Sequence, residues 1–137
     1  VILSQSREMM TTMMDPDALA EALGVTLTEH AGGEKGRYYG GRHISLRRGL
    51  GPVNRRCALA HELGHLIAGH DPAAAGWIRA RQERQADEFA ARLLISPIEY
   101  ALAEQLHGPS LSAIAHELGV TVHLATTWQS LYERQSV

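Results

Sequence analysis

The chain has 137 residues, enough for one hydrophobic core and too few for two independent ones. Its formal net charge of −2 provides no overall attraction to nucleic acid or to an anionic membrane surface. The one cysteine excludes an intramolecular disulfide, and no apolar run is long enough to span a membrane, so we expect a cytoplasmic protein.

The first third of the chain predicts a short helix followed by strands. Residues 1–14 contain all four methionines, and we expect a flexible segment there without an assigned function. Asp15 followed by Pro16 is typical of a helix start. Between residues 25 and 50, alternating segments separated by glycines predict two or three antiparallel strands. We expect the last strand, residues 43–47, to form one wall of a cleft, where an extended peptide can add as a further strand.

A basic segment overlaps these strands and continues beyond them. It contains seven basic residues and no acidic one, namely Lys35, Arg37, Arg42, Arg47, Arg48, Arg55 and Arg56. One explanation is a solvated basic face. The other is a positively charged rim, with Arg42, Arg47 and Arg48 as candidates, that draws an acidic substrate segment into the cleft. Nucleic-acid binding fits less well, because only Tyr38 and Tyr39 offer aromatic surfaces for stacking.

An H-E-x-x-H motif at residues 61–65 lies in a run, residues 53–68, that can be helical throughout. One turn apart on a helix, His61 and His65 share a face and can reach one metal ion. Glu62 points about 100° away from His61, where it can hold an attacking water without being a ligand. Leucines on the opposite side and small residues beside the histidines favour burial between a core and a second helix. Two hydrogen-bonded surface histidines are the simpler alternative.

The next helical segment, residues 83–94, offers a third ligand. Its apolar residues form one stripe, and Glu83 and Asp87 lie at the edge of that stripe, one turn apart. An inward carboxylate is costly unless it binds something, so Glu83 is our candidate ligand. Asp87 is a candidate acceptor for the second ring N–H of a ligating histidine. An ordinary salt-bridged surface pair, and Glu88 as the ligand instead, are the alternatives.

Several side chains near the motif are left without a firm role. Cys57 lies one turn before His61, and we interpret it as a small buried residue rather than a ligand or redox switch. His70 is expected on the opposite side of the helix from His61, which makes it a poor ligand. Four donors are candidates for stabilising an oxyanion, and the choice between them stays open: Tyr38, Tyr39, Tyr100 and His70.

Residues 109–137 are expected to form a helical hairpin that packs on a core domain of residues 15–108. Residues 111–121 resemble the first helix and turn of a helix-turn-helix. Direct nucleic-acid binding is nevertheless not expected, because the stretch between Leu93 and Glu133 contains no Lys or Arg to neutralise phosphates. We interpret the hairpin as a packing or substrate-docking unit.

The hairpin also repeats part of the metal motif. Residues 116–119 read H-E-L-G, as do residues 61–64, but Val120 stands where a second histidine is needed. We therefore expect no second metal site.

The motif and the segment after it together resemble a known family. Residues 61–70 read H-E-L-G-H-L-I-A-G-H, and residues 83–97 read E-x-x-A-D-x-F-A-A-x-L-L-x-x-P. This pattern is similar to the ImmA/IrrE family of metallo-endopeptidases, strongly from about residue 44 to residue 97 and weakly in the flanks. The resemblance implies an α+β fold with a zincin-like core, in which a short antiparallel sheet packs on helices. It also implies that the substrate is an intracellular protein, typically a transcriptional repressor of a phage, a mobile element or a stress regulon.

The resemblance implies one zinc ion per chain, held by His61, His65 and Glu83, with Glu62 as general base. Zinc lowers the pKa of a coordinated water toward about 7, and Glu62 then takes its proton. The alternative is a non-catalytic zincin-like scaffold that binds a regulatory or toxin–antitoxin protein. The presence of Glu62 argues against the scaffold, because a structural metal site needs ligands but no base.

Overall fold

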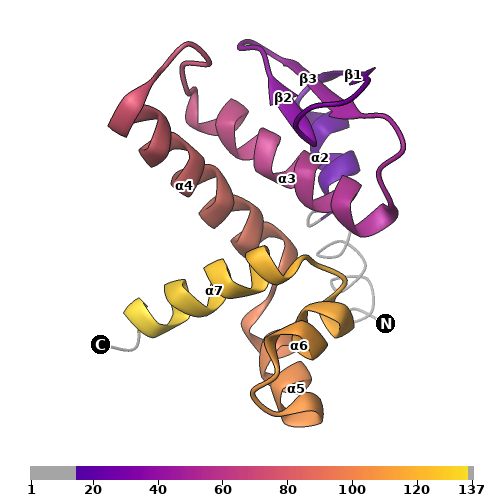
Figure 1. Cartoon of the computed structure of the whole chain (residues 1–137), viewed down its shortest axis with the longest axis vertical. Coiled ribbons are helices and arrows are strands. Elements are labelled where there is room, and N and C mark those ends of the chain that lie inside the picture. Colours follow the sequence, from indigo (N-terminus) through magenta and orange to yellow (C-terminus); the bar gives the residue numbers. More distant parts are fainter. Residues whose placement is uncertain (1–14, 136–137) are drawn as a thin grey trace.

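The computed structural model describes residues 15–135 and shows six helices and a three-stranded sheet in that range (Figure 1). The elements are α2 (Pro16–Ala22), β1 (Thr26–His30), β2 (Gly36–Tyr38), β3 (His43–Arg47), α3 (Pro52–Ala68), α4 (Gly76–Leu94), α5 (Pro97–His107), α6 (Leu111–Leu118) and α7 (Val122–Gln135). The predicted α+β fold class is therefore confirmed. The segment 1–14, which we expect to be flexible, lies outside the described residues.

Local capping explains where the helices begin and end. The Asp15 side chain accepts a hydrogen bond from the Asp17 backbone N–H at the start of α2. Ser96 caps α5 in the same way, before a proline in the first helical turn. At the end of α3, Gly69 adopts the left-handed conformation with φ 67°, which closes the helix. The start of α2 agrees with the sequence-based prediction.

The sheet differs from the expected antiparallel arrangement. Its order is β1-β3-β2, with β3 parallel to β1 and antiparallel to β2. Burial explains this order, because β3 is the apolar strand: Ile44 and Leu46 are buried in the core, whereas β1 is largely exposed. Ser45 is also buried and shares a hydrogen bond of 2.7 Å with His30 Nδ1. Because β3 lies in the centre of the sheet, β1 and β2 pair with its two edges.

Both β2 and β3 contact α3, but of the described strands only β2 lines the cleft, so the expectation that the last strand would wall it is wrong. β2 is an edge strand of the described sheet and packs against α3. β3 pairs with neighbours on both sides and has no open edge in the described sheet.

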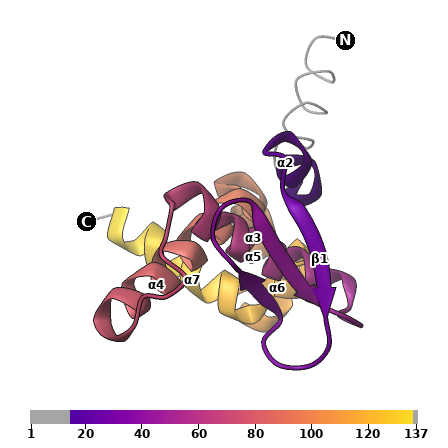
Figure 2. The same cartoon turned by 90° about the horizontal axis from the view of Figure 1, so that it is seen from above.

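Helix α3 is the centre of the molecule. Figures 1 and 2 show the sheet and α2 on one side of α3, and α4 on the other. One buried cluster joins α2, the sheet and α3, and a second joins α3 and α4 to α5, α6 and α7. The described part of the C-terminal hairpin thus shares a core with α3 and α4, while its treatment as a unit separate from residues 15–108 stays a prediction. None of the described helices is long and apolar enough to cross a lipid bilayer.

The contact between α3 and α4 is close because small residues meet there. A Cβ atom placed on Gly64 would lie 3.0 Å from the Cα atom of Ala86. Ala60, Ala86 and Ala90 are fully buried at the same contact. The prediction that small residues beside the histidines face a second helix is confirmed. Ile67, in the last turn of α3, is 49% exposed.

Candidate metal centre

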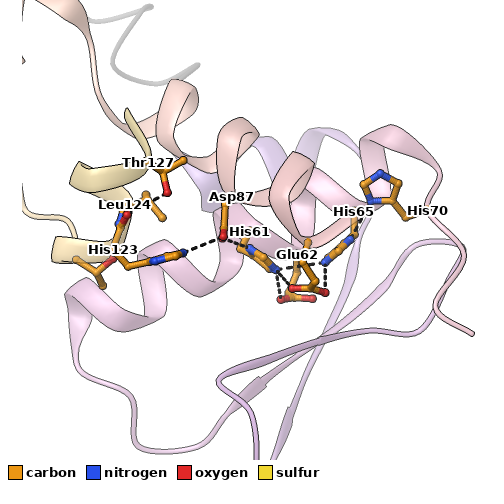
Figure 3. A network of polar contacts seen from close by, with 10 residues as sticks. His61, Glu62, His65, His70, Asp87, His123, Leu124 and Thr127 are labelled. Atoms are coloured by element: carbon orange, nitrogen blue, oxygen red, sulfur yellow. Dashed lines mark hydrogen bonds and ion pairs between the residues drawn. The ribbon is translucent and has the colours of Figure 1, made fainter. Parts of the chain in front are cut away.

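The close contact of α3 and α4 brings three potential metal ligands together, His61, His65 and Glu83. Figure 3 shows the two histidines side by side on α3. His61 Nε2 lies 3.2 Å from His65 Nε2. The Glu83 carboxylate faces both rings, with Oε2 at 3.0 Å from His61 Nε2 and Oε1 at 3.1 Å from His65 Nε2. In a tetrahedral zinc site with bonds of about 2.0–2.1 Å, neighbouring ligand atoms are about 3.3 Å apart. These separations are of that size, and one donor atom from each residue lies within 4.8 Å of the others, so the cluster is compatible with a metal site.

The Nδ1 atoms of His61 and His65 form hydrogen bonds away from the cluster, so that Nε2 of each ring faces the possible metal position. His61 Nδ1 donates to Asp87 Oδ1 at 2.8 Å, as a carboxylate can only accept. His65 Nδ1 shares a hydrogen bond of 2.9 Å with His70 Nδ1, and His70 Nε2 in turn bonds Gln85 Oε1 at 2.9 Å. A neutral His70 that donates to the amide oxygen accepts from His65. With a metal ion on Nε2, these two partners would hold each ring in the orientation that coordination requires.

The position of His70 differs from the sequence-based expectation. An uninterrupted helix would place it opposite His61, but α3 ends at Gly69, whose left-handed conformation turns the chain back. His70 thus lies beside His65 rather than on the far face. Gly69 in the sequence could have predicted this position, because a left-handed glycine at a helix end changes the direction of the chain for the residue after it.

Electrostatics at the site favour positive charge between the carboxylates. Burial alone lowers the pKa of His61, but hydrogen bonds with Asp87 and Glu83 raise it to about 10. Hydrogen bonds from His61 and His65 hold the pKa of Glu83 well below its usual range. His65 is buried, whereas 45% of the Glu83 side chain is exposed, so the cluster is reached from the Glu83 side. These are properties that a cation site needs.

Glu62 lies beside the cluster without belonging to it. Its Oε2 is 3.9 Å from His61 Nε2, and burial raises the pKa of its carboxyl. The backbone of β2 covers it closely: a Cβ atom on Gly36 would lie 2.8 Å from Glu62 Cγ. A buried carboxylate with increased proton affinity, next to a cation site, is suited to take a proton from water.

The cluster opens into a cavity of about 980 Å³. Its walls come from residues 34–39 around β2, from α3, from the segment that joins α3 to α4, from α4, and from the start of α7. Tyr38, Tyr39 and His70 line this cavity, whereas Tyr100 lies in the core and stacks on Trp128 with ring centroids 4.4 Å apart. The structure thus brings three of the four candidate oxyanion donors to the site.

Glu88 and Cys57 were the other possible ligands near the motif. Glu88 forms an ion pair of 2.9 Å with Arg134 and does not join the cluster. Cys57 is buried at the cavity wall, and burial raises the pKa of its thiol, as expected of a packing residue.

The proposed basic rim only partly coincides with the cavity. The cations that line it are Lys35, Arg37 and Arg79. Arg47 donates to the Gly33 carbonyl at 2.7 Å, and Arg48 pairs with Glu29 at 3.3 Å. Arg42 is likewise absent from the cavity lining, so the role of the named arginines stays a prediction.

Sequence reasoning missed Gln85, the partner of His70, and a histidine on α7. His123 on α7 also lines the cavity, and its Nε2 lies 2.8 Å from Asp87 Oδ2. Nothing local in the sequence links these two residues, which are 36 positions apart.

Comparison with known proteins agrees with this geometry. The family model for peptidase M78, described as the IrrE N-terminal-like domain, matches residues 20–126, a range that contains the sheet, both helices of the cluster and His123. No curated protein matched the chain. The predicted ImmA/IrrE resemblance is confirmed: the chain belongs to the peptidase M78 family of metallopeptidases.

Proposed function

We propose that this protein is a zinc-dependent endopeptidase that cleaves a specific cytoplasmic protein, a transcriptional repressor or a similar regulator. The observation that carries the proposal is the triangle of His61, His65 and Glu83 donor atoms with the buried Glu62 beside it. A purely structural zinc site usually has four protein ligands and needs no base, whereas three ligands and a base are typical of a catalytic site.

We assign the residues of the site separate roles in peptide-bond hydrolysis. His61, His65 and Glu83 would hold zinc, which supplies Lewis acidity and lowers the pKa of water. Glu62 accepts the proton of the attacking water and passes it to the leaving amine, a general acid–base contribution of about 10²–10⁴-fold. Asp87 and His70 keep the two imidazoles in the required tautomer. Tyr38, Tyr39 or His70 would stabilise negative charge on the carbonyl oxygen.

A protein substrate suits the shape of the cavity. β2 is an edge strand and forms one wall beside Glu62, so an extended peptide can pair with its backbone. A volume of about 980 Å³ accommodates several side chains of such a peptide. The cavity cations Lys35, Arg37 and Arg79, together with the outer Arg42, Arg47 and Arg48, support recruitment of an acidic substrate segment.

The test uses Glu62→Gln in the zinc-loaded protein, with candidate repressors as substrates. The amide cannot accept the proton, so peptide-bond cleavage is expected to fall by about 10²–10⁴-fold. Zinc content and binding of the substrate protein should be unchanged, because Glu62 is not a ligand. Glu117→Gln is the matched control, since Glu117 occupies the same place in the second H-E-L-G segment. Full biological activity of Glu62→Gln in cells would refute proteolysis and favour the scaffold.

A further inference from the structure

His123 of the C-terminal hairpin contacts Asp87 beside the candidate metal cluster. This histidine lies in the first turn of α7, and its side chain is 69% exposed. Figure 3 shows it pointing at Asp87 from the side opposite His61. Its Nε2 donates to Asp87 Oδ2 at 2.8 Å, the same length as the bond between His61 Nδ1 and Asp87 Oδ1.

Asp87 is thus held at both oxygen atoms. One oxygen accepts from a metal-ligand candidate on α3 and the other from α7, while the carboxylate itself belongs to α4. A carboxylate bound at one oxygen alone can rotate about its Cβ–Cγ bond. A second hydrogen bond from the other side fixes its plane, and with it the direction of the His61 ring.

The position of His123 is itself well determined. Its neighbours Leu124 and Ala125 are buried in the cluster that α7 shares with α3 and α4. Thr127 Oγ1 donates to the His123 carbonyl at 3.0 Å. The backbone is therefore anchored, although the ring is exposed. An exposed ion pair alone contributes about 0–1 kcal/mol to stability, so stability does not account for this arrangement.

We propose that His123 is a positioning residue of the metal centre. By holding Asp87 Oδ2, it keeps Oδ1 on His61 Nδ1 and keeps His61 Nε2 directed at the metal, so that the hairpin completes the site. This inference rests on the proposed metal site and assigns a role to α7 that does not involve contact with the reacting atoms.

The experiment measures zinc affinity by competition with a chelator in the purified full chain, without any substrate. Loss of a direct partner of a metal ligand typically weakens metal binding by about 10–100-fold, and a partner one step further out should act at the lower end. We expect about tenfold weaker binding in His123→Ala. His123→Gln should recover most of the affinity, because its amide N–H can donate where Nε2 does. His116→Ala, an exposed histidine on α6 of the same hairpin, should bind zinc as the unmodified chain does.

A double-mutant cycle separates positioning from a general effect on the hairpin. If His123 acts through Asp87, His123→Ala should change nothing further in the Asp87→Ala background, which has no side chain to hold. The unfolding temperature of each metal-free variant shows that the chain remains folded. Unchanged affinity in His123→Ala, or full additivity with Asp87→Ala, would overturn this inference alone. An unmodified chain that binds no zinc would overturn the proposed function as well.

Discussion

Two segments of this chain share the sequence H-E-L-G, and only the first contributes to the group of side chains that could hold a metal ion. The first lies inside α3, where the helix continues through Gly64 and places His65 one turn after His61. The second ends α6, because Gly119 adopts the left-handed conformation with φ 67°. The chain then leaves the helical path, and Val120 enters the core. The same four residues thus have opposite outcomes, depending on whether the helix continues.

The two segments also differ in the helix that packs beside them. Gly64 lets α4 approach closely, and α4 contributes Glu83 and Asp87 to the histidines. In the second segment His116 is exposed, and Glu117 pairs with His107 at 3.4 Å. The comparison teaches that this motif becomes a site only where its helix continues and a second helix supplies carboxylates.

The largest effect is expected from substitutions of the residue that directly follows each H-E-L-G segment, His65 in the first and Val120 in the second. His65→Val removes a ligand, and zinc affinity should fall by more than about 100-fold, beyond the loss typical of an outer partner. Val120→His should create no zinc site, because residue 120 is not one helical turn from His116. Burying its ring in the core should instead destabilise the fold by about 1–3 kcal/mol. Metal analysis and denaturant unfolding measure both. A second zinc in Val120→His would contradict the comparison.

A large but smaller loss is expected for the carboxylate on α4. Glu83→Ala should weaken zinc binding by about 100-fold, because water can replace an oxygen ligand that is partly exposed. Glu88→Ala is the control, since this residue pairs with Arg134 and should leave zinc binding unchanged. Chelator competition decides between them, and the reverse result would move the third ligand to Glu88.

Gly36→Ala tests the role of β2, which covers Glu62 in the first H-E-L-G segment; no strand covers the second segment in the described structure. The added Cβ would lie 2.8 Å from Glu62 Cγ, so the flexible Glu62 side chain must move. We expect kcat to fall by about tenfold or more with unchanged zinc content, because small misplacements of a catalytic group are costly. Gly51→Ala is the matched control, as its Cβ would meet no atom within 4 Å. Equal activity of both variants would mean that Glu62 does not depend on this contact.

The smallest effect is expected at the end of the second segment. Gly119→Ala places a side chain at φ 67° and should lower the free energy of unfolding by about 1 kcal/mol. Zinc affinity should not change, since α6 contributes no ligand. Urea unfolding and chelator competition test this, and a change in zinc affinity would show that α6 matters to the site after all.

Residues close in sequence determined much of this protein. Asp15-Pro16 and Ser96-Pro97 specify helix starts through side-chain caps and a fixed φ, which are interactions within one turn. The positions of His61 and His65 on one face follow from helical periodicity alone, and so does the inward edge position of Glu83. The H-E-x-x-H motif, together with this glutamate, was therefore sufficient to predict the candidate cluster.

Tertiary structure decided what lies around that cluster. The choice of β2 rather than β3 as the cavity wall depends on strand order, which the burial of β3 determines across the whole sheet. The contact of His123 with Asp87 joins residues 36 positions apart. It exists because α7 packs on α4, and no local pattern encodes that packing. Periodicity and capping act between neighbours in the chain, whereas the partners of Glu62 and Asp87 depend on how separate elements share one core.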